Sequence, residues 1–148
     1  MMLAEKHIIL AEDDEDDSAF FEEALMTIPE APSFLRARDG AELTSMLEKL
    51  STPPYLIFMD LNMPRKSGTQ CILEIRSRAD MKDLPIIVLS TSSREEIVNS
   101  AYQSGANLYI QKPSDFNLWS KAIARVLEMD WDIHQPYSVR DKFILSEI

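Results

Sequence analysis

Polar side chains that could support chemistry follow short apolar runs, at the points where buried strands would end. A carboxylate in such a place is costly unless it reaches solvent, a cation or hydrogen-bond donors. Two such coincidences could arise by chance, but four strand ends in one chain favour a common site. In chain order these residues are Glu12, Asp13, Asp60, Ser90 and Lys112.

These residue types suit phosphoryl transfer. Crowded carboxylates repel one another, and a hard divalent cation with oxygen ligands removes that repulsion. Mg²⁺ suits a site of one or two carboxylates completed by water and a phosphate. An aspartate such as Asp60 can attack an activated phosphoryl group and form an aspartyl phosphate. A metal ion, Lys112 and the Ser90 hydroxyl could then stabilise the charge on the phosphoryl oxygens.

Each residue also has an ordinary structural interpretation. Acidic side chains are favourable at a helix N-terminus, and we assign Glu15, Asp16 and Asp17 to such a solvated run. Taken alone, Lys112 would more often be a surface lysine, and Ser90 would more often cap the following helix. The site therefore depends on a fold that brings these positions together.

The periodicity of the chain predicts that fold, because short apolar runs alternate with amphipathic stretches. Strict alternation favours a parallel sheet with helices on both faces, and parallel strands deliver their carboxyl ends to one edge. The second predicted strand alternates only weakly, which places it at the edge of the sheet. The predicted strands are 7–11, 33–37, 55–60, 84–89 and 108–111, and the predicted helices are 18–27, 41–50, 69–78, 94–104 and 115–127.

Length and composition limit the remaining classes. The chain has 148 residues, of which 45% are hydrophobic and 27% charged, as in a soluble globular domain. Its net charge of -10 would repel phosphate backbones, so we expect no nucleic-acid partner. No apolar run is long enough to span a membrane and the start lacks a signal-peptide pattern, so we expect a cytoplasmic protein. The single cysteine, Cys71, excludes internal disulfides and a cysteine metal cluster.

The predicted elements divide the chain into a domain at 1–128 and a C-terminal extension at 129–148. The extension is too short for an output domain. Its apolar side chains, including Trp131, Phe143 and Leu145, would pack back on the domain or cover a dimer partner.

The order and spacing of these residues resemble the receiver domain of two-component response regulators, from about His7 to Leu127. The resemblance implies a doubly wound α/β fold: a five-stranded parallel sheet in the order 2-1-3-4-5 with five helices, as in CheY. The motifs that carry it are Glu12-Asp13, Asp60-Leu61-Asn62-Met63-Pro64 with Gly68, Ser90-Thr91, Tyr109, and Lys112-Pro113.

The resemblance also implies the roles of the acidic residues. Asp60 would accept a phosphoryl group from the phosphohistidine of a sensor histidine kinase. Asp13 and Asp60 would bind Mg²⁺ directly, with the backbone carbonyl of Asn62 as a further ligand and Glu12 acting through water. Such a protein catalyses only its own phosphorylation, and its dephosphorylation, and is not a conventional enzyme.

The remaining motif residues would respond to the phosphoryl group. By the same resemblance, Lys112 pairs with the acids and phosphoryl oxygens, Ser90 moves to hydrogen-bond the phosphoryl group, and Tyr109 rotates inward as an aromatic switch. The bond between Lys112 and Pro113 would be cis. Thr91 is larger than the small residue usual after the switch hydroxyl, which would narrow access to the site.

A narrower resemblance points to small stand-alone regulators, some of which serve bacterial phytochromes and pair as dimers. It implies a phytochrome-type kinase, a downstream protein partner and a homodimer. The segments that carry it are Thr91-Ser92-Ser93, Ala101-Tyr102, 105–110 and Trp131.

Three other interpretations remain in view. A Mg²⁺-dependent phosphatase with an aspartate nucleophile would need a second aspartate two positions later, where Asn62 stands and cannot protonate a leaving group. A nucleotide- or flavin-binding module would need a glycine-rich loop after the first strand, where this chain is acidic. A receiver-shaped scaffold that takes no phosphate would not need the complete set of residues. The sequence therefore favours a phosphorylation-controlled switch of protein–protein interaction.

Overall fold

A computed structural model describes residues 6–131 and 140–145, which form one parallel sheet flanked by helices. The strand order is β2-β1-β3-β4-β5, as the resemblance implied. The strands are β1 (His7–Ala11), β2 (Ser33–Ala37), β3 (Leu56–Asp60), β4 (Ile86–Ser90) and β5 (Leu108–Gln111). The helices are α1 (Glu15–Met26), α2 (Gly40–Lys49), α3 (Gly68–Ser77), α4 (Glu95–Ser104) and α5 (Phe116–Glu128), with a short 3₁₀ turn η2 (Arg140–Lys142).

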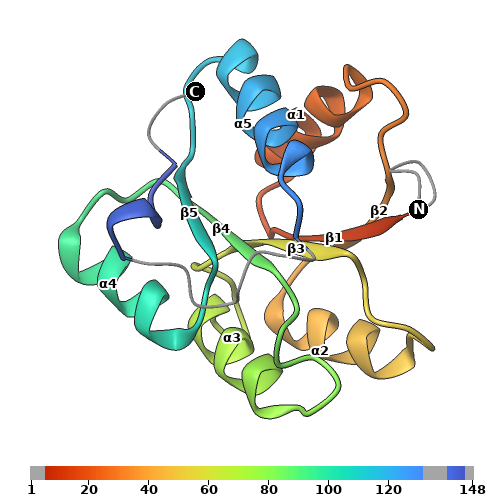
Figure 1. Ribbon diagram of the computed structural model, residues 1–148, viewed down its shortest axis with the longest axis vertical. Coiled ribbons are helices and arrows are strands. Elements are labelled where there is room, and N and C mark those ends of the chain that lie inside the picture. The colour runs from red at the N-terminus through yellow and green to blue at the C-terminus, as the bar shows by residue number, and fades with distance from the viewer. Residues whose placement is uncertain (1–5, 132–139, 146–148) are drawn as a thin grey trace.

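The helices cover the two faces of the sheet unequally (Figure 1). Helices α1 and α5 lie on one face, and α2, α3 and α4 lie on the other. All five residues of β3 are buried, as expected for a central strand covered on both faces. The edge strand β2 is partly exposed, which explains its weak alternation. Within the described residues, none of the helices combines the length and apolar character that a bilayer span requires.

The predicted and observed boundaries differ most at the start of α1. The sequence predicted a helix from Ser18, whereas α1 begins at Glu15 because the side chain of Asp14 caps it and accepts a hydrogen bond from the Asp17 N–H. Strand β4 begins two residues later than predicted, after Pro85, which lacks an N–H for the ladder. The early start of α1 matters for the site.

The ends of the later helices agree with the sequence. Gly105 follows α4 with φ of 112°, the left-handed conformation that glycine adopts without steric cost. The side chain of Asp115 caps α5 by accepting a hydrogen bond from the Asn117 N–H. Gly105 therefore marks the end of α4 before β5, and Asp115 marks the start of α5 after it.

The described part of the C-terminal extension packs on the domain. Trp131, Phe143 and Leu145 are all buried, and Ile144 forms a parallel bridge with Tyr109 of β5. Of the two alternatives for the extension, packing on the domain and covering a dimer partner, these residues follow the first. Residues 132–139 and 146–148 of the extension lie outside the described part.

Gly68 allows the loop after β3 to approach α3 closely. Its N–H donates to the Leu61 carbonyl at 2.9 Å, and a Cβ at this position would lie 2.6 Å from the Asp60 carbonyl oxygen and 2.8 Å from Leu61 Cα. Both atoms belong to the backbone, so the side chain of an alanine would force the loop that carries Asp60 to move.

We predict that Gly68→Ala lowers the free energy of unfolding by about 1–3 kcal/mol, the usual cost of overpacking. Urea unfolding followed by circular dichroism measures the change. The half-buried neighbour Thr69 supplies the control, because Thr69→Ala removes atoms and adds none. Equal stabilities for the two variants would contradict the role of this close approach.

Candidate functional site

The fold brings the predicted residues to one edge of the sheet. Glu12 directly follows β1, Asp60 ends β3, Ser90 ends β4 and Lys112 directly follows β5. The ladder joins these ends closely, because Asp60 pairs with Leu89 and the Lys112 N–H donates to the Ser90 carbonyl at 2.7 Å. Parallel pairing therefore turns positions up to 100 residues apart into neighbours.

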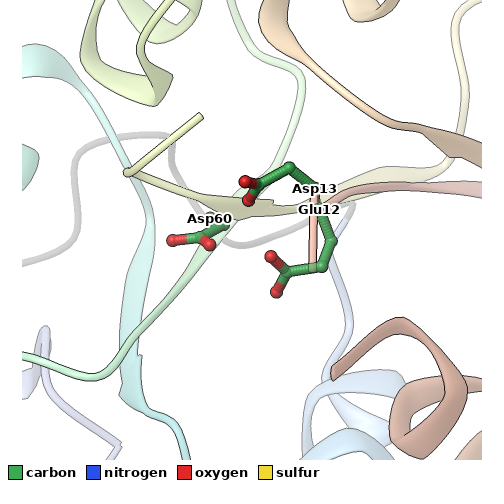
Figure 2. A group of neighbouring side chains, drawn as sticks. All are labelled: Glu12, Asp13 and Asp60. Carbon is green, nitrogen blue, oxygen red and sulfur yellow. The ribbon is translucent and has the colours of Figure 1, made fainter. Parts of the chain in front are cut away.

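Three carboxylates form the centre of the site (Figure 2). Glu12, Asp13 and Asp60 each offer an oxygen within 4.8 Å of the others. Glu12 and Asp60 are 1% and 7% exposed, whereas Asp13 is open to solvent. Carboxylate oxygens at this spacing, with one side open to water, suit a hard and partly hydrated divalent cation.

Asn62 supports this cluster from the loop after β3. Its N–H donates to Asp60 Oδ1 at 3.2 Å, which fixes one oxygen of that carboxylate. The side chain of Asn62 is exposed. That its backbone carbonyl binds a metal ion stays a prediction.

Lys112 supplies positive charge directly to the carboxylates of the site. Its Nζ lies 2.7 Å from Glu12 Oε1, 2.7 Å from Asp17 Oδ2 and 3.2 Å from Asp60 Oδ2. The side chain is only 7% exposed. An ammonium group has three N–H donors, and here each donor has a carboxylate partner. Burial of Lys112 is thus compensated by three ionic contacts.

The contact with Asp17 corrects our interpretation of the acidic run. Its pattern in the sequence predicts a solvated Asp17, but this residue is half-buried and contacts Lys112 as closely as Glu12 does. The error follows from the predicted start of α1, because a helix beginning at Ser18 leaves Asp17 outside its first turn. The signal for the true start was Asp14, a good N-cap residue directly after the acidic pair.

The protonation of the site follows from its burial and charge. Burial raises the pKa of Glu12 to about 8, and the hydrogen bond with Asp60 and its negative charge add to the effect. Burial opposes the charged form of Lys112, but its hydrogen bonds to Asp17 and Glu12 and the charge of Asp60 outweigh this and raise its pKa. Lys112 therefore stays charged. Glu12 keeps its proton to a higher pH than an exposed glutamate does, because the positive charge near it does not offset its burial.

The predicted switch residues form a chain of contacts beside the carboxylates. Ser90 is 1% exposed, and its Oγ accepts a hydrogen bond from the Ser92 N–H at 3.2 Å. The Tyr109 hydroxyl donates to the Ser92 carbonyl at 2.7 Å, and this tyrosine is itself 1% exposed. Thr91 is exposed at the rim, where its carbonyl accepts from Gln111 Nε2 at 3.3 Å. Ser90 thus connects the acidic site with Tyr109.

A cavity of about 250 Å³ opens beside Ser90, between the loop after β3 and helix α4. Its wall is rich in hydroxyl groups and could admit a small polar group to the site. The lining residues are Leu61, Asn62, Ser67, Thr69, Ser90, Glu96, Ile97 and Ser100.

The prediction of a cis bond before Pro113 is wrong for this structure. No peptide bond among the described residues is cis, so the Lys112–Pro113 bond is trans. The trans form is favoured by roughly 0.5–1 kcal/mol even before proline. With the trans bond, the Lys112 N–H still reaches Ser90 and its Nζ still reaches the carboxylates, so these contacts do not require the cis form.

The fold and the site together define the class of this protein. It is a doubly wound α/β domain whose carboxyl edge carries an acidic cluster suited to a divalent cation, with a lysine and a serine beside it. The sequence pattern of the response regulator receiver domain matches residues 8–124. The chain belongs to this family, and it is therefore a receiver domain of two-component response regulators, a class of signalling proteins not counted among enzymes.

Known proteins agree with this assignment. The chain is 35% identical to the response regulator Rcp1 of Synechocystis sp. over 112 residues, covering 72% of this chain and 76% of that protein. The crystal structure of the Mn²⁺-bound form of Rcp1 superposes with a TM-score of 0.77 and 31% identity, over 84% of this chain and 96% of the other. The phosphorylated cyanobacterial phytochrome response regulator RcpA gives a TM-score of 0.77 and 31% identity, over 84% and 92%.

The raised pKa of Glu12 gives a prediction for protein free of divalent cations. Since the pKa in the folded state is about 8 and the ordinary value is 4.5, the folded protein holds the proton more tightly than the unfolded chain. This stabilisation is complete below about pH 4.5 and is lost as the pH rises towards 8. Glu12→Gln stays neutral and avoids the loss. The stability of the wild type relative to this variant should fall with rising pH, by at most about 1.4 kcal/mol per pH unit.

Urea unfolding across this pH range, with a chelator present, measures the difference. The exposed Glu23 supplies the control, because Glu23→Gln removes the same charge away from the site. Parallel pH profiles for the wild type and Glu12→Gln would contradict the shift.

The contact between Lys112 and Asp17 gives a second prediction. Asp17→Asn removes one of the three carboxylates that contact Lys112. The ammonium group then interacts more strongly with Glu12 and Asp60, and these two carboxylates are also needed to bind a divalent cation. The affinity for Mg²⁺ should therefore drop roughly three- to tenfold, equivalent to about 1 kcal/mol. Isothermal titration calorimetry measures it. Asp16→Asn is the control, since the Asp16 carboxylate is exposed and is not one of the three that contact Lys112. Equal losses in both variants would reduce the effect to net charge.

Proposed function

We propose that a sensor histidine kinase phosphorylates this chain on Asp60 in a Mg²⁺-dependent reaction, and that the phosphoryl group switches a protein-binding surface. The observation that carries the proposal is the environment of Asp60. It ends the central strand, lies within the carboxylate cluster and has the Lys112 ammonium 3.2 Å from Oδ2. A nucleophile held between a cation site and an ammonium group suits attack on a phosphoryl group.

The acidic residues would hold the cation. Asp13 and Asp60 are the direct ligands in this proposal, with the Asn62 carbonyl as a third and Glu12 acting through water. A bound Mg²⁺ would neutralise the negative charge that develops on the phosphoryl oxygens. The Mn²⁺-bound form of Rcp1 supports a divalent cation in this family. The choice of Mg²⁺ follows from the few carboxylates and from the exposure of Asp13, which leaves room for water ligands.

The residues of the chain would then perform the transfer. An oxygen of Asp60 attacks the phosphorus of the phosphohistidine, the P–N bond breaks as the P–O bond forms, and the histidine nitrogen leaves with the electron pair and takes a proton. The Asn62 N–H holds the other oxygen of the carboxylate. Lys112 exchanges its contact with Asp60 for one with a phosphoryl oxygen, and Ser90 donates its hydroxyl hydrogen to another.

The response would pass from Ser90 to Tyr109. Ser90 Oγ accepts a hydrogen bond from the Ser92 N–H in this structure. When Ser90 moves towards the phosphoryl group, it therefore pulls the loop after β4 with it. The Tyr109 hydroxyl is bonded to that loop through the Ser92 carbonyl. Tyr109 then acts as the aromatic switch, and Thr91 at the rim narrows the approach to the site.

Partners follow from the family and from the relatives. A phytochrome-type histidine kinase is the proposed donor, which the similarity to the phytochrome response regulator RcpA supports. The net charge of -10 favours a protein target with a basic surface and disfavours nucleic acid and anionic membranes. The expected location is cytoplasmic.

A homodimer is also proposed, but Phe143 and Leu145 are buried within this chain, so the dimer would have to use other surfaces. We keep 1–128 as the receiver domain and 129–148 as its extension.

The proposed acceptor gives a direct prediction. After incubation with Mg²⁺ and acetyl phosphate, the wild type should gain the mass of one phosphoryl group, and Asp60→Asn should gain none because an amide cannot attack phosphorus. Intact-mass spectrometry measures both, and a chelator added beforehand should abolish the gain. Asp13→Asn keeps the acceptor and weakens the cation site, so it should be labelled more slowly at low Mg²⁺ than at high Mg²⁺. Labelling of Asp60→Asn at the wild-type rate would show that the acceptor is another residue.

A further inference from the structure

The described end of the chain occupies the outer edge of β5. In Figure 1 this segment runs between β5 and α4. The Tyr109 N–H donates to the Phe143 carbonyl at 2.9 Å, and the Leu145 N–H donates to the Tyr109 carbonyl at 3.0 Å. Residues 143–145 thus pair with β5 in parallel, in the place that a sixth strand would take. This pairing satisfies backbone groups at an edge that would otherwise be open.

The side chains of this segment alternate as in a strand. Phe143 is fully buried in the core on the side of α2, α3 and α4, and Leu145 is buried in the core on the opposite side of the sheet. Ile144 between them is 42% exposed. The ring of Phe143 packs edge-on against Tyr102 at 5.1 Å and lies 6.1 Å from Tyr109. Phe143 is thus an aromatic anchor that packs between two aromatic rings.

A polar contact fixes the other end of the segment to α4. Arg140 Nε donates to Asn99 Oδ1 at 2.8 Å, and its guanidinium lies 3.3 Å from the Glu95 carboxylate. The same guanidinium lies 5.9 Å from the centre of the Phe143 ring. Backbone pairing, an aromatic anchor and a charged contact are the features of a bound extended peptide, here supplied by the chain itself.

Tyr109 is the residue that this segment shares with the proposed phosphorylation site. Its backbone pairs with residues 143–145, its ring faces Phe143, and its hydroxyl bonds to the Ser92 carbonyl. Ser92 in turn donates its N–H to Ser90 at the carboxylate site. A continuous series of contacts thus runs from the site to the docked segment.

We propose that residues 140–145 are an intramolecular ligand of the β5–α4 surface, and that their docking and the phosphorylation of Asp60 favour each other through Tyr109. This proposal rests on the proposed function. The Phe143 ring lies 6.1 Å from the Tyr109 ring and the backbones of the two segments pair, so the docked segment opposes an outward turn of the tyrosine. A phosphoryl group that draws Ser90 and its loop inward also favours the inward ring. The coupling is reciprocal, so docking must strengthen binding at Asp60 by the same factor.

The test uses the full chain and beryllofluoride with Mg²⁺, which stands in for the phosphoryl group on Asp60. Beryllofluoride should increase hydrogen-exchange protection of the Tyr109 and Leu145 amides. Phe143→Ala should weaken beryllofluoride binding by about fivefold or more, as coupling of ordinary size requires. Ile144→Ala is the matched control, because this neighbouring side chain points to solvent and its backbone pairing is kept.

A second variant separates coupling from loss of the core. Arg140→Ala weakens docking without opening a cavity, so it should lower beryllofluoride affinity in the same direction while near-UV circular dichroism stays unchanged. If the wild type binds no beryllofluoride, the proposed function fails. If all variants bind it equally and amide protection does not change, only this inference is overturned. Protection at Leu145 that falls on dilution would also overturn it, because the contact would then join two copies of the chain.

Discussion

The contact of one buried lysine with three carboxylates is the interaction on which the site depends. Lys112 contacts Glu12 and Asp17 near the start of α1 and Asp60 at the end of β3, so it joins three parts of the chain, its own included, that are far apart in sequence. Burying Glu12 and Asp60 without it would leave uncompensated charge, which is strongly destabilising. Even with Lys112, burial and the neighbouring Asp60 raise the pKa of Glu12, because the lysine does not fully offset the cost of placing two carboxylates in a buried site. Incomplete neutralisation of this kind suits the cluster of Glu12, Asp13 and Asp60 to a divalent cation.

The sheet gives this contact its precision. Strand β5 has only four residues and is followed directly by Lys112 at the site. The same strand carries Tyr109, whose backbone pairs with Ile144. The Lys112 N–H is bonded to the Ser90 carbonyl, so the register of β4 and β5 fixes the lysine relative to the serine. Residues at the site and Tyr109 are thus separated by only a few positions of one short strand. The same strand serves the chemistry at one end and the C-terminal segment along its edge.

Local pattern was sufficient to predict the strands, because each is a short apolar run with a clear end. It also placed Asp60, Ser90 and Lys112, since parallel strands share an edge. It missed Asp17, because the three-residue error in the start of α1 moved that carboxylate off the helical turn that faces Lys112. Sequence could not specify that Phe143 lies between Tyr102 and Tyr109, since this packing joins segments 34 residues apart through tertiary contact alone.

The way in which a signal can leave the site follows from electrostatic screening. A phosphoryl group adds a charge of about -1.5 to -2, and the chain already carries a net charge of -10. At physiological ionic strength the field of such a charge is screened beyond about 8 Å, so a partner at the surface gains little from the charge itself. The phosphorylated and unphosphorylated states must therefore differ, at surfaces far from Asp60, in the positions of packed side chains. The contacts from Ser90 through Ser92 to Tyr109, and from there to Phe143, provide such a mechanical connection.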